Sequence, residues 1–385
     1  MCTTTALRQQ SWLKDELGLR FDPFACLDAA EEPYLPACLV GHEDFAALWG
    51  DWPSFLFAPP GGGKTAFRVR LARACRVAQD GRRVFPLLFL PPRPVDPQQP
   101  PDESDFFAEL LSQAALALLL ELAYRPESFL NLEVPPRQEV RLFLEQNLPA
   151  PLDYYLAQLE ESGTPEPIAR GFDPTAVGLP NEPSPKRIGF LCAALRETPV
   201  GFASLAEPLA RLEQMVRLLI NHLGYQAVYL LVDGVDAYVQ DPAAIARQLQ
   251  PLFTRVRAWQ EQALFVKFFL PDELRPLIKK SYQFLLTPPS KVVIIKWHAA
   301  MLAQVVQERL RLASEGGFDS LVAISTPDVA DQIELRLAEA VHPALPREVI
   351  RLVQRVFYEH TRRVGPYGRL EQQDFEAALR WYAHH

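Results

Sequence analysis

The chain has 385 residues, of which 49% are hydrophobic and 22% are charged, and its formal net charge is -8. That length supplies enough apolar material for one large domain or two modest ones with a buried core. The acidic balance argues against a generally basic nucleic-acid-binding surface. The mean hydropathy of -0.04 and the lack of an unbroken apolar run of about 20 residues argue against a membrane-spanning protein.

The cysteines and the first residues predict a cytoplasmic protein. Five cysteines are scattered along the chain, and none of them are spaced as in a CxxC motif. This usage predicts reduced thiols, with no disulfide framework and no zinc site. Lys14, Asp15 and Glu16 stand where a secretory signal would need an apolar segment.

Five short runs rich in Val, Ile, Leu, Phe and Tyr are typical of β-strands. None of them alternates apolar and polar residues, so both faces of the sheet should be covered by helices. Helical patterns lie between the runs, as in Thr65–Gln79 and Pro242–Gln262. This succession predicts an α/β fold with a parallel sheet sandwiched by helices. The expected strands are Ser54–Ala58, Val84–Leu90, Ala227–Asp233, Leu264–Leu270 and Lys291–Trp297.

More than a hundred residues separate the second expected strand from the third. This stretch, 91–225, predicts a helical insertion that contains one exposed Pro- and Gly-rich loop, Gly163–Pro185. After the last strand the pattern turns helical again and predicts a separate small helical domain. The expected helices are Ser104–Tyr124, Arg137–Gln146, Leu152–Glu161, Arg187–Arg196 and Leu205–Leu223 in the insertion, and Ala299–Ala313, Pro327–Val341, Leu345–Arg363 and Leu370–Tyr382 in the tail.

The strongest functional signal is a glycine-rich segment between the first expected strand and the next helix. Residues 58–65 fit the P-loop pattern of a small residue, any four residues, Gly-Lys, and Ser or Thr. Its glycines allow the backbone N–H groups to approach phosphates closely. Lys64 would bridge the β- and γ-phosphates, and Thr65 would ligate Mg²⁺. A glycine-rich turn that merely holds a lysine is the alternative. The expected nucleotide contacts here are Ala58, Pro59, Pro60, Gly61, Gly62, Gly63, Lys64, Thr65 and Ala66.

An apolar run that ends in a carboxylate, Ala227–Asp233, predicts the acidic partner of this loop. Asp233 would hold the hydration shell of Mg²⁺. Asp236 lies just past the strand end, where a base or a water-positioning group could reach the γ-phosphate. We therefore predict Lys64, Asp233 and Asp236 as catalytic residues, and Thr65 and Asp233 as metal ligands. For Asp236 the alternative is an ordinary loop carboxylate in a turn.

The segment Leu231–Asp236 resembles the Walker B box of STAND-class NTPases, including their NACHT branch, which reads hydrophobic-D-G-hydrophobic-D-E. Ala237 stands where that pattern has Glu, so the resemblance implies nucleotide binding with slow hydrolysis. Leu39–Glu43 is similar to the hydrophobic-G-R-E segment that these proteins and origin-recognition-type AAA+ ATPases place against adenine. His42 replaces the Arg of that segment. The resemblance therefore implies adenine-side contacts from Val40, Gly41 and His42.

Two further segments resemble the same superfamily. Pro346 and Arg347 open a helix as in its lid motif, which implies that they touch the nucleotide, with Arg347 at the γ-phosphate. The segment 21–40 resembles the start of bacterial P-loop ATPases related to the KAP and STAND groups, which often carry insertions between their Walker motifs.

The resemblance covers 39–90, 225–300 and 340–382. It implies an ASCE sheet with strand order 5-1-4-3-2 and a helical lid. The expected domains are an N-terminal segment 1–45 with the adenine-side contact, a P-loop NTPase domain 46–300 that holds the insertion 91–225, and a helical lid 301–385.

Several other charged residues are weaker candidates. An arginine finger supplied to a neighbouring subunit must be exposed, and Arg275, Arg309 and Arg347 are candidates. His298 is expected to pack or to cap a helix rather than to catalyse. Arg347, Arg351 and Arg355 line one stripe of the tail helix. Such a stripe either meets phosphates or an acidic partner, or pairs with Glu348 and Glu359, and we favour the pairing.

Three functions stay open. The first is a regulatory ATPase switch that binds ATP and Mg²⁺, self-assembles into a homo-oligomer in the ATP state and acts on a separate effector or sensor protein. The resemblance places such proteins in bacterial defence or signalling. The second is a DNA loader or transposition regulator of the AAA+ type, which would need a basic groove. The third is a nucleotide-binding pseudo-ATPase scaffold, which Ala237 favours.

Overall fold

The computed structural model describes residues 8–93, 96, 98–179, 182–200, 206–239, 241–329 and 331–384. The chain divides into two compact units. The larger holds Asp44–Phe57 and Phe67–Ile294, and the smaller holds the residues up to Glu43, Ala58–Ala66 and the residues from Ile295 on. Each unit has its own buried hydrophobic core. The N-terminal segment, which we expected to stand alone, therefore shares a unit with the expected lid.

The larger unit is built on a five-stranded sheet in which all neighbouring strands run parallel. This confirms the expected α/β class with a parallel sheet. The strand order is β2-β3-β4-β1-β5. A sheet can be read from either edge, so this is also the order 5-1-4-3-2. The strands are β1 (Ser54–Phe57), β2 (Val84–Phe89), β3 (Ala227–Val232), β4 (Leu264–Leu270) and β5 (Lys291–Ile294).

The position of each strand in the sheet explains its burial and, for β5, where it ends. Every residue of β1, β2, β3 and β4 is buried, which explains why their sequences do not alternate apolar and polar residues. β5 is an edge strand that pairs only with β1, and Ile294 is opposite Phe57, the last residue of β1. Because the chain leaves β1 for the glycine-rich loop at that point, β5 ends at Ile294 and not at the expected Trp297.

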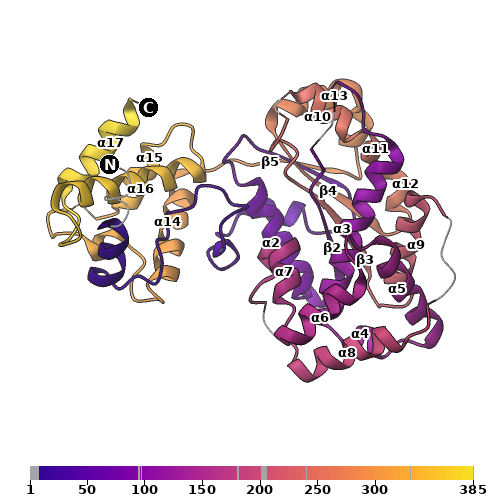
Figure 1. Cartoon of the computed structure of the whole chain (residues 1–385). Coiled ribbons are helices and arrows are strands. Elements are labelled where there is room, and N and C mark those ends of the chain that lie inside the picture. The colour runs from indigo at the N-terminus through magenta and orange to yellow at the C-terminus, as the bar shows by residue number, and fades with distance from the viewer. Residues whose placement is uncertain are drawn as a thin grey trace. The chain divides into compact units, whose positions relative to one another are not determined.

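Helices of the insertion cover one part of the sheet. α3 (Glu103–Tyr124) packs on β2, and α9 (Pro208–Asn221) packs on β3. In Figure 1 the other insertion helices lie together beside them. These are α4 (Glu127–Leu130), α5 (Val134–Asn147), α6 (Leu152–Ser162), α7 (Glu166–Phe172) and α8 (Pro185–Glu197). The expected start of α9 at Leu205 lies outside the described residues.

The expected exposed loop Gly163–Pro185 is wrong over its first half. Residues there form α7 and a short 3-10 helix, η5 (Pro174–Ala176), and Asp173 between them is only 1% exposed. Its prolines lie at the first turns of these helices, where the missing N–H costs nothing. Ile168, Ala169 and Ala176 are buried in the core of the larger unit. We misread proline at helix starts as a sign of a loop.

Two expected helices are shorter than predicted. Pro242–Gln262 is divided into α10 (Pro242–Gln248), α11 (Gln250–Phe253) and α12 (Val256–Gln260). Pro251 breaks it, because proline has no N–H and its ring clashes with the preceding turn. α2 (Lys64–Arg76) ends before Gln79, and the backbone turns to positive φ at Ala78.

The larger unit contains one further α-helix, α13 (Arg275–Ser281), and the described residues also form several short 3-10 or π turns. Arg275 is the first residue of α13. The short turns are η1 (Trp12–Glu16), η2 (Leu35–Ala37), η3 (Glu43–Ala47), η4 (Gln79–Gly81), η6 (Asp272–Leu274), η7 (Gln283–Leu286) and η8 (Leu321–Ile324).

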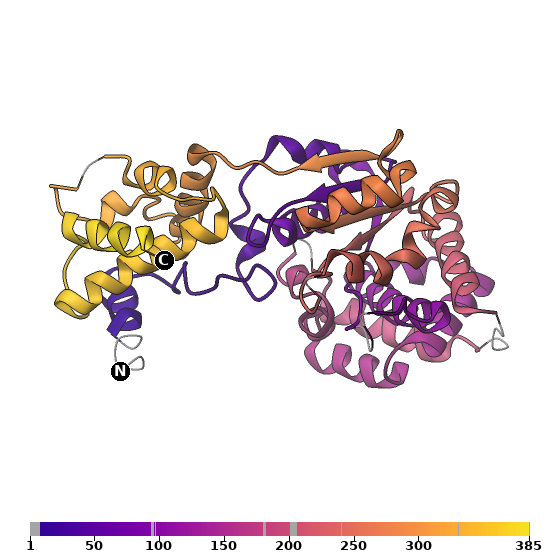
Figure 2. The same cartoon turned by 90° about the horizontal axis from the view of Figure 1, so that it is seen from above.

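The smaller unit is a helical bundle closed by the N-terminal segment. Figures 1 and 2 show the indigo N-terminal segment beside the yellow C-terminal helices. Trp12 and Phe24 each pack edge-on against Phe357. The helices are α14 (Ala299–Ala313), α15 (Ile333–Glu339), α16 (Pro346–Val364) and α17 (Gln372–Ala383). α15 begins later than expected, because Gln332 before it has a φ of 60°.

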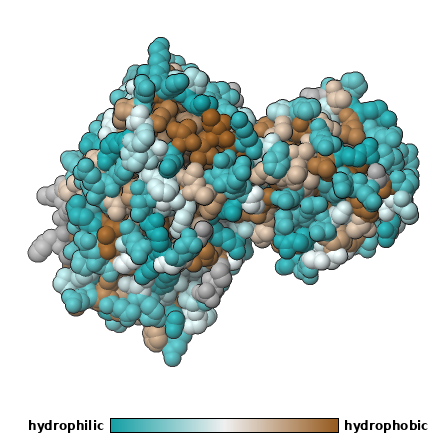
Figure 3. Space-filling view, turned by 180° about the vertical axis from the view of Figure 1, so that it is seen from behind, coloured by the Kyte–Doolittle hydropathy of each residue, from teal (hydrophilic) through white to brown (hydrophobic). Residues whose placement is uncertain are grey.

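Hydrophobic residues reach the surface only in limited areas. On the face that Figure 3 shows, hydrophilic residues cover most of the surface and hydrophobic ones gather in a few patches. By length and composition, α3 alone among the described helices could cross a membrane, but 72% of its apolar window is buried inside the unit. The core helix of a globular protein has the same character.

One buried lysine should give the larger unit a measurable pH dependence. Lys267 on β4 is 0% exposed, and its Nζ donates to the carbonyl oxygens of Gly50 and Trp52 at 2.8 and 2.7 Å. Burial lowers the pKa of Lys267 from 10.5 to about 7. Between those values the unfolded chain binds more protons than the folded one, so stability rises with pH.

We expect this lysine's contribution to the free energy of unfolding to increase by about 3 kcal/mol from pH 7 to pH 10. The measurement is chemical denaturation of the wild type and of Lys267→Met across that range, taking the difference at each pH. Lys280→Met, an exposed position, is the control. If the difference in the free energy of unfolding stays constant with pH, burial does not lower the pKa of Lys267.

Candidate functional site

The loop between β1 and α2 needs its glycines for geometric reasons. Gly61 and Gly63 have φ values of 79° and 94°, a region that other residues rarely adopt. Gly62 donates its N–H to the carbonyl oxygen of Pro59 at 2.9 Å. A Cβ atom on Gly62 would lie 2.9 Å from that same oxygen. Each of the three positions therefore excludes a side chain or penalises it.

Lys64 bonds to the loop that it closes. It is 7% exposed, and its Nζ lies 3.1 Å from the carbonyl oxygen of Ala58 and 3.4 Å from that of Pro59. The N–H groups of Gly61 and Gly63 have no acceptor among the described residues. A buried ammonium and unpaired backbone donors on one short loop are the chemistry that binds phosphate oxygens. Thr65 follows in the first turn of α2.

The expected lid residues lie against this loop within the smaller unit. The Arg347 N–H is 3.4 Å from the carbonyl oxygen of Gly61. A Cβ atom on Gly61 would come within 2.7 Å of the Cβ of Arg347, so the contact requires glycine. The Arg347 Nε donates to the carbonyl oxygen of Leu27 at 3.3 Å. Pro346 stands at the first position of α16, as expected for a helix start. The γ-phosphate contact of Arg347 stays a prediction.

Trp297 is a loop contact that the sequence reading missed. Its Nε1 donates to the carbonyl oxygen of Gly62 at 2.9 Å, and its ring is 3.2 Å from where a Cβ on Gly63 would lie. His42 meets the Trp297 ring edge-on with centroids 5.1 Å apart, and its Nε2 is 3.3 Å from the Lys296 carbonyl oxygen. The expected sheet order could have predicted this contact. Because β5 pairs with β1 in parallel, a residue that follows β5 lies next to the loop that follows β1.

The other two adenine-side candidates differ in their surroundings. Val40 packs against the core of the smaller unit. A Cβ atom on Gly41 would meet nothing within 4 Å. The segment is thus anchored at Val40 and at His42, with an open position between them.

The acidic candidate Asp233 follows β3 in the larger unit and is 3% exposed. Its N–H donates to the Phe89 carbonyl oxygen at 3.2 Å. Its Oδ2 accepts from Nε of Arg68 at 3.3 Å, and its Oδ1 accepts no hydrogen bond from the described residues. Arg68 belongs to α2, the helix that begins at Lys64. Asp233 therefore has one carboxylate oxygen that accepts no hydrogen bond from the described residues.

Arg68 is the first member of a buried chain of ion pairs. Its Nη1 lies 3.4 Å from Oδ1 of Asp173, whose Oδ2 accepts from Nη1 of Arg76 at 2.9 Å. Nε of Arg76 also donates to Oε1 of Glu121 at 2.9 Å. All four side chains are at most 6% exposed. We name the series Asp233, Arg68, Asp173, Arg76 and Glu121 the buried ion chain.

Within the buried ion chain, Asp173 and Arg76 favour each other's charged forms. Burial opposes ionisation of Asp173, but Arg76 and Arg68 outweigh it, so the pKa of Asp173 lies below its ordinary value. Burial also opposes the charge of Arg76, but Asp173 and Glu121 raise its pKa above the ordinary value. No sequence pattern pointed to Asp173, since it lies about a hundred residues from the arginines that hold it.

Several weaker candidates now have a structural role. Arg309 is 6% exposed and donates to Glu32 at 2.8 Å and to the Pro23 carbonyl oxygen at 2.7 Å. It is therefore not an exposed arginine finger. The Nδ1 of His298 accepts from the Met301 N–H at 3.4 Å at the start of α14, which confirms the expected cap.

The arginine stripe of α16 pairs as we favoured. Arg351 lies 3.8 Å from Glu348, and Arg355 lies 2.5 Å from Glu359. Both guanidinium groups also lie over the ring of Trp381. Asp236 is half-buried in the turn that follows β3, and its role at a γ-phosphate stays a prediction.

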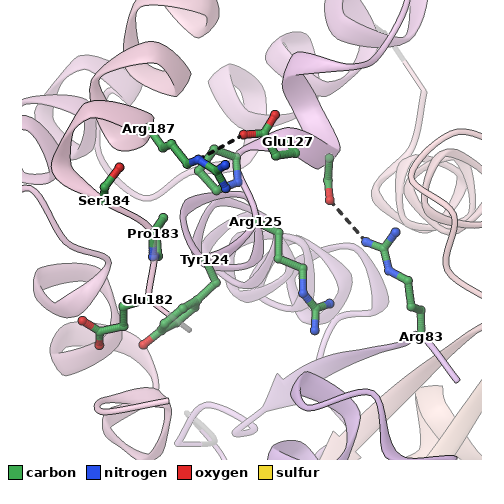
Figure 4. A pocket seen from close by; sticks show the side chains of 10 residues that line it. Arg83, Tyr124, Arg125, Glu127, Glu182, Pro183, Ser184 and Arg187 are labelled. Carbon is green, nitrogen blue, oxygen red and sulfur yellow. Dashed lines mark hydrogen bonds and ion pairs between the residues drawn. The ribbon is translucent and has the colours of Figure 1, made fainter. Parts of the chain in front are cut away.

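An open cavity of about 680 Å³ lies at the C-terminal end of α3. Figure 4 shows the side chains that line it. Arg83, Arg125 and Arg187 line it, and each has a partner in the protein. Arg83 donates to Ser128 at 3.2 Å, Arg187 lies 3.5 Å from Glu127, and Arg125 donates to the Arg76 carbonyl oxygen. The three arginines that line the cavity thus each have a partner within the protein.

Among the described residues, no group of three or more His, Cys, Asp and Glu side chains could hold a metal ion by itself. Comparison of the chain with protein-family models, with curated proteins and with solved structures found no match. The functional assignment therefore depends on the residues described above.

Proposed function

We propose that the chain binds ATP and Mg²⁺ at the loop 58–65 and hydrolyses ATP slowly, as a regulatory switch of the P-loop ATPase type. The observation that carries the proposal is the loop itself. Gly61 and Gly63 combine positive φ with N–H groups that lack an acceptor among the described residues, and Lys64 is held against the same backbone. Phosphate groups would supply the acceptors that these donors lack.

Each residue has a proposed role. Lys64 moves from the Ala58 and Pro59 carbonyl oxygens to the β- and γ-phosphates. Thr65 and Asp233 are the proposed ligands of a hydrated Mg²⁺, which would supply charge neutralisation to the phosphates. Asp236 positions or deprotonates the attacking water. The fit of Asp233 is supported by its unoccupied carboxylate oxygen and by its burial.

Contacts on the loop support a switch. Trp297 and Arg347 both bond to loop carbonyl oxygens, at Gly62 and Gly61, and His42 packs on Trp297. A nucleotide that draws the Gly63 N–H toward its phosphates would also move the Gly62 carbonyl oxygen, which belongs to the same peptide and accepts from Trp297. Differential binding of ATP and ADP can then bias two arrangements of these contacts.

We place this switch in the cytoplasm, with self-assembly in the ATP state and a separate effector or sensor protein as its partner. The pseudo-ATPase scaffold is the second candidate. It is favoured by Ala237 and by the ion pair that Arg68 makes with Asp233, because a guanidinium there competes with a cation.

The test is the molar mass in solution, measured without nucleotide, with ADP and with a slowly hydrolysed ATP analogue, each with and without DNA. We expect the mass to increase with the analogue alone, and we expect no effect of DNA. A scaffold would bind nucleotide without a change of mass. Failure of both nucleotides to bind at millimolar concentration would refute the proposal, and a mass increase that requires DNA would favour the DNA-associated alternative.

A further inference from the structure

Arg68 lies between two carboxylates that come from different parts of the larger unit. Its Nε donates to Asp233 at the end of β3, and its Nη1 donates to Asp173, between α7 and η5 of the helical insertion. The distances are 3.3 and 3.4 Å, so neither carboxylate dominates. Within the described part of the chain, Arg68 is the only side-chain partner of Asp233.

The divided pairing matters because it is buried. Charged groups that are removed from water depend strongly on their partners, and the loss of one partner leaves an uncompensated charge. Arg68 and Asp173 have side chains that are 6% and 1% exposed. A guanidinium that lost Asp173 would therefore bond more fully to Asp233.

The two carboxylate oxygens of Asp173 have different partners. The Thr175 hydroxyl donates to Oδ1 of Asp173, the same oxygen that Arg68 contacts. The other oxygen of Asp173 is held by Arg76, which continues the buried ion chain to Glu121. Glu121 lies 3.8 Å from Arg125, which lines the cavity in Figure 4. The chain of charges thus runs from the end of β3 to a solvent-accessible surface of the insertion.

From this geometry we infer that Arg68 is the positioning residue for Asp233, and that Asp173 of the insertion sets how strongly Arg68 holds that carboxylate. The inference deepens the proposed function, because Asp233 is there assigned to Mg²⁺. It gives the helical insertion a role in regulation. When Asp173 of the insertion holds Arg68 strongly, Asp233 is available to the hydrated cation. When Asp173 releases Arg68, the guanidinium neutralises the Asp233 carboxylate.

The first test measures the affinity for a slowly hydrolysed ATP analogue at several Mg²⁺ concentrations and in EDTA. Asp173→Asn should weaken the Mg²⁺-dependent affinity about three- to tenfold, since Arg68 then bonds mainly to Asp233. Affinity in EDTA should not change. Asp153→Asn is the matched control, because this insertion carboxylate is 83% exposed and lies near Arg196.

A second variant separates regulation from a general loss of structure. Thr175→Val removes the hydroxyl that shares Oδ1 of Asp173 with Arg68, so Asp173 should hold Arg68 more strongly. The Mg²⁺-dependent affinity should then increase, in the opposite direction to Asp173→Asn. If both variants lower the affinity equally, with and without Mg²⁺, the effect is structural and the inference is wrong.

The positioning contact can be tested without nucleotide. In the free protein, Arg68→Gln should increase hydrogen–deuterium exchange of the amides in 232–236 about tenfold, because Asp233 loses its side-chain partner. Unchanged exchange there would overturn the positioning role. If the wild type binds no nucleotide, the proposed function and the metal part of this inference both fail, and the exchange result decides the positioning contact alone. If it binds nucleotide but Asp173→Asn leaves the Mg²⁺ dependence unchanged, only the regulatory inference fails.

Discussion

Replacing Lys64 with alanine should weaken ATP binding by at least about 100-fold, which corresponds to about 2.7 kcal/mol. The ammonium is the one side-chain cation of the loop 58–65, and charge-assisted hydrogen bonds to phosphate are among the strongest in proteins. Within the protein, its Nζ donates to two carbonyl oxygens of its own loop. Their loss should cost far less than the loss of two phosphate contacts. Titration of the purified protein with a fluorescent ATP analogue measures the effect.

The control for this variant is Lys280→Ala, which removes an exposed lysine. Circular dichroism of both variants checks that the fold is kept. If Lys64→Ala retains an affinity within a few-fold of the wild type while its fold is intact, the phosphate-binding role of the loop is refuted. The glycine geometry would then have to be explained by the contacts of Trp297 and Arg347 alone.

The parts of the fold that followed from the sequence are those decided by local chemistry. Unbroken apolar runs predicted strands buried on both faces, and the structure has them within a residue or two, except at the edge strand β5. The glycines at 61–63 predicted a backbone that other residues rarely adopt, and Gly61 and Gly63 have positive φ values. Both features depend only on neighbours in the chain and on burial.

The errors arose where local signals are ambiguous. Proline is compatible with loops and with the first turn of a helix, and in the segment 163–185 it marked two helix starts. The same residue type inside the pattern Pro242–Gln262 had the opposite effect, since Pro251 broke a helix that periodicity predicted as continuous. Only the packing of the surrounding apolar residues distinguishes these cases.

The electrostatic environment of the candidate site could not be read from the sequence. Arg68 and Arg76 are part of a helix whose apolar neighbours pack in the core, and in sequence they resemble surface charges. Their partners Asp173 and Glu121 belong to an insertion whose position on the sheet the sequence does not specify. The pairing of Asp233 with a guanidinium is therefore the finding that most changes the prediction. The carboxylate that we predicted as a metal ligand is paired with Arg68.

That sharing bears on the rate of hydrolysis. In the proposed function, a divalent cation near Asp233 would compete with Arg68. The residue after Asp236 is Ala237, where the Walker B pattern that the segment resembles has a glutamate. Both features lower the expected rate without removing the phosphate-binding loop. They also leave Asp236 as the residue past β3 best suited to act on water, since it is half-buried and follows the strand end by only a short turn.

Asp236→Asn should therefore lower the turnover of ATP about 100-fold, the range expected for the loss of a general base, while the affinity for ATP stays within about threefold. Asparagine keeps the size and polarity of the side chain but cannot take a proton. Single-turnover hydrolysis and equilibrium binding of the analogue, measured on the same preparation, separate the two effects.

The matched control is Glu273→Gln, which neutralises an exposed carboxylate near the end of β4. It should change neither quantity. If Asp236→Asn hydrolyses ATP at the wild-type rate, the water is activated elsewhere. If its affinity for ATP falls as far as its turnover, Asp236 contributes to ATP binding and to the shape of the loop. The lower turnover would then not be evidence for a general base. Only retained affinity together with lost turnover assigns the base to Asp236. That result would show that Asp236 stabilises the transition state and does not contribute to ATP binding.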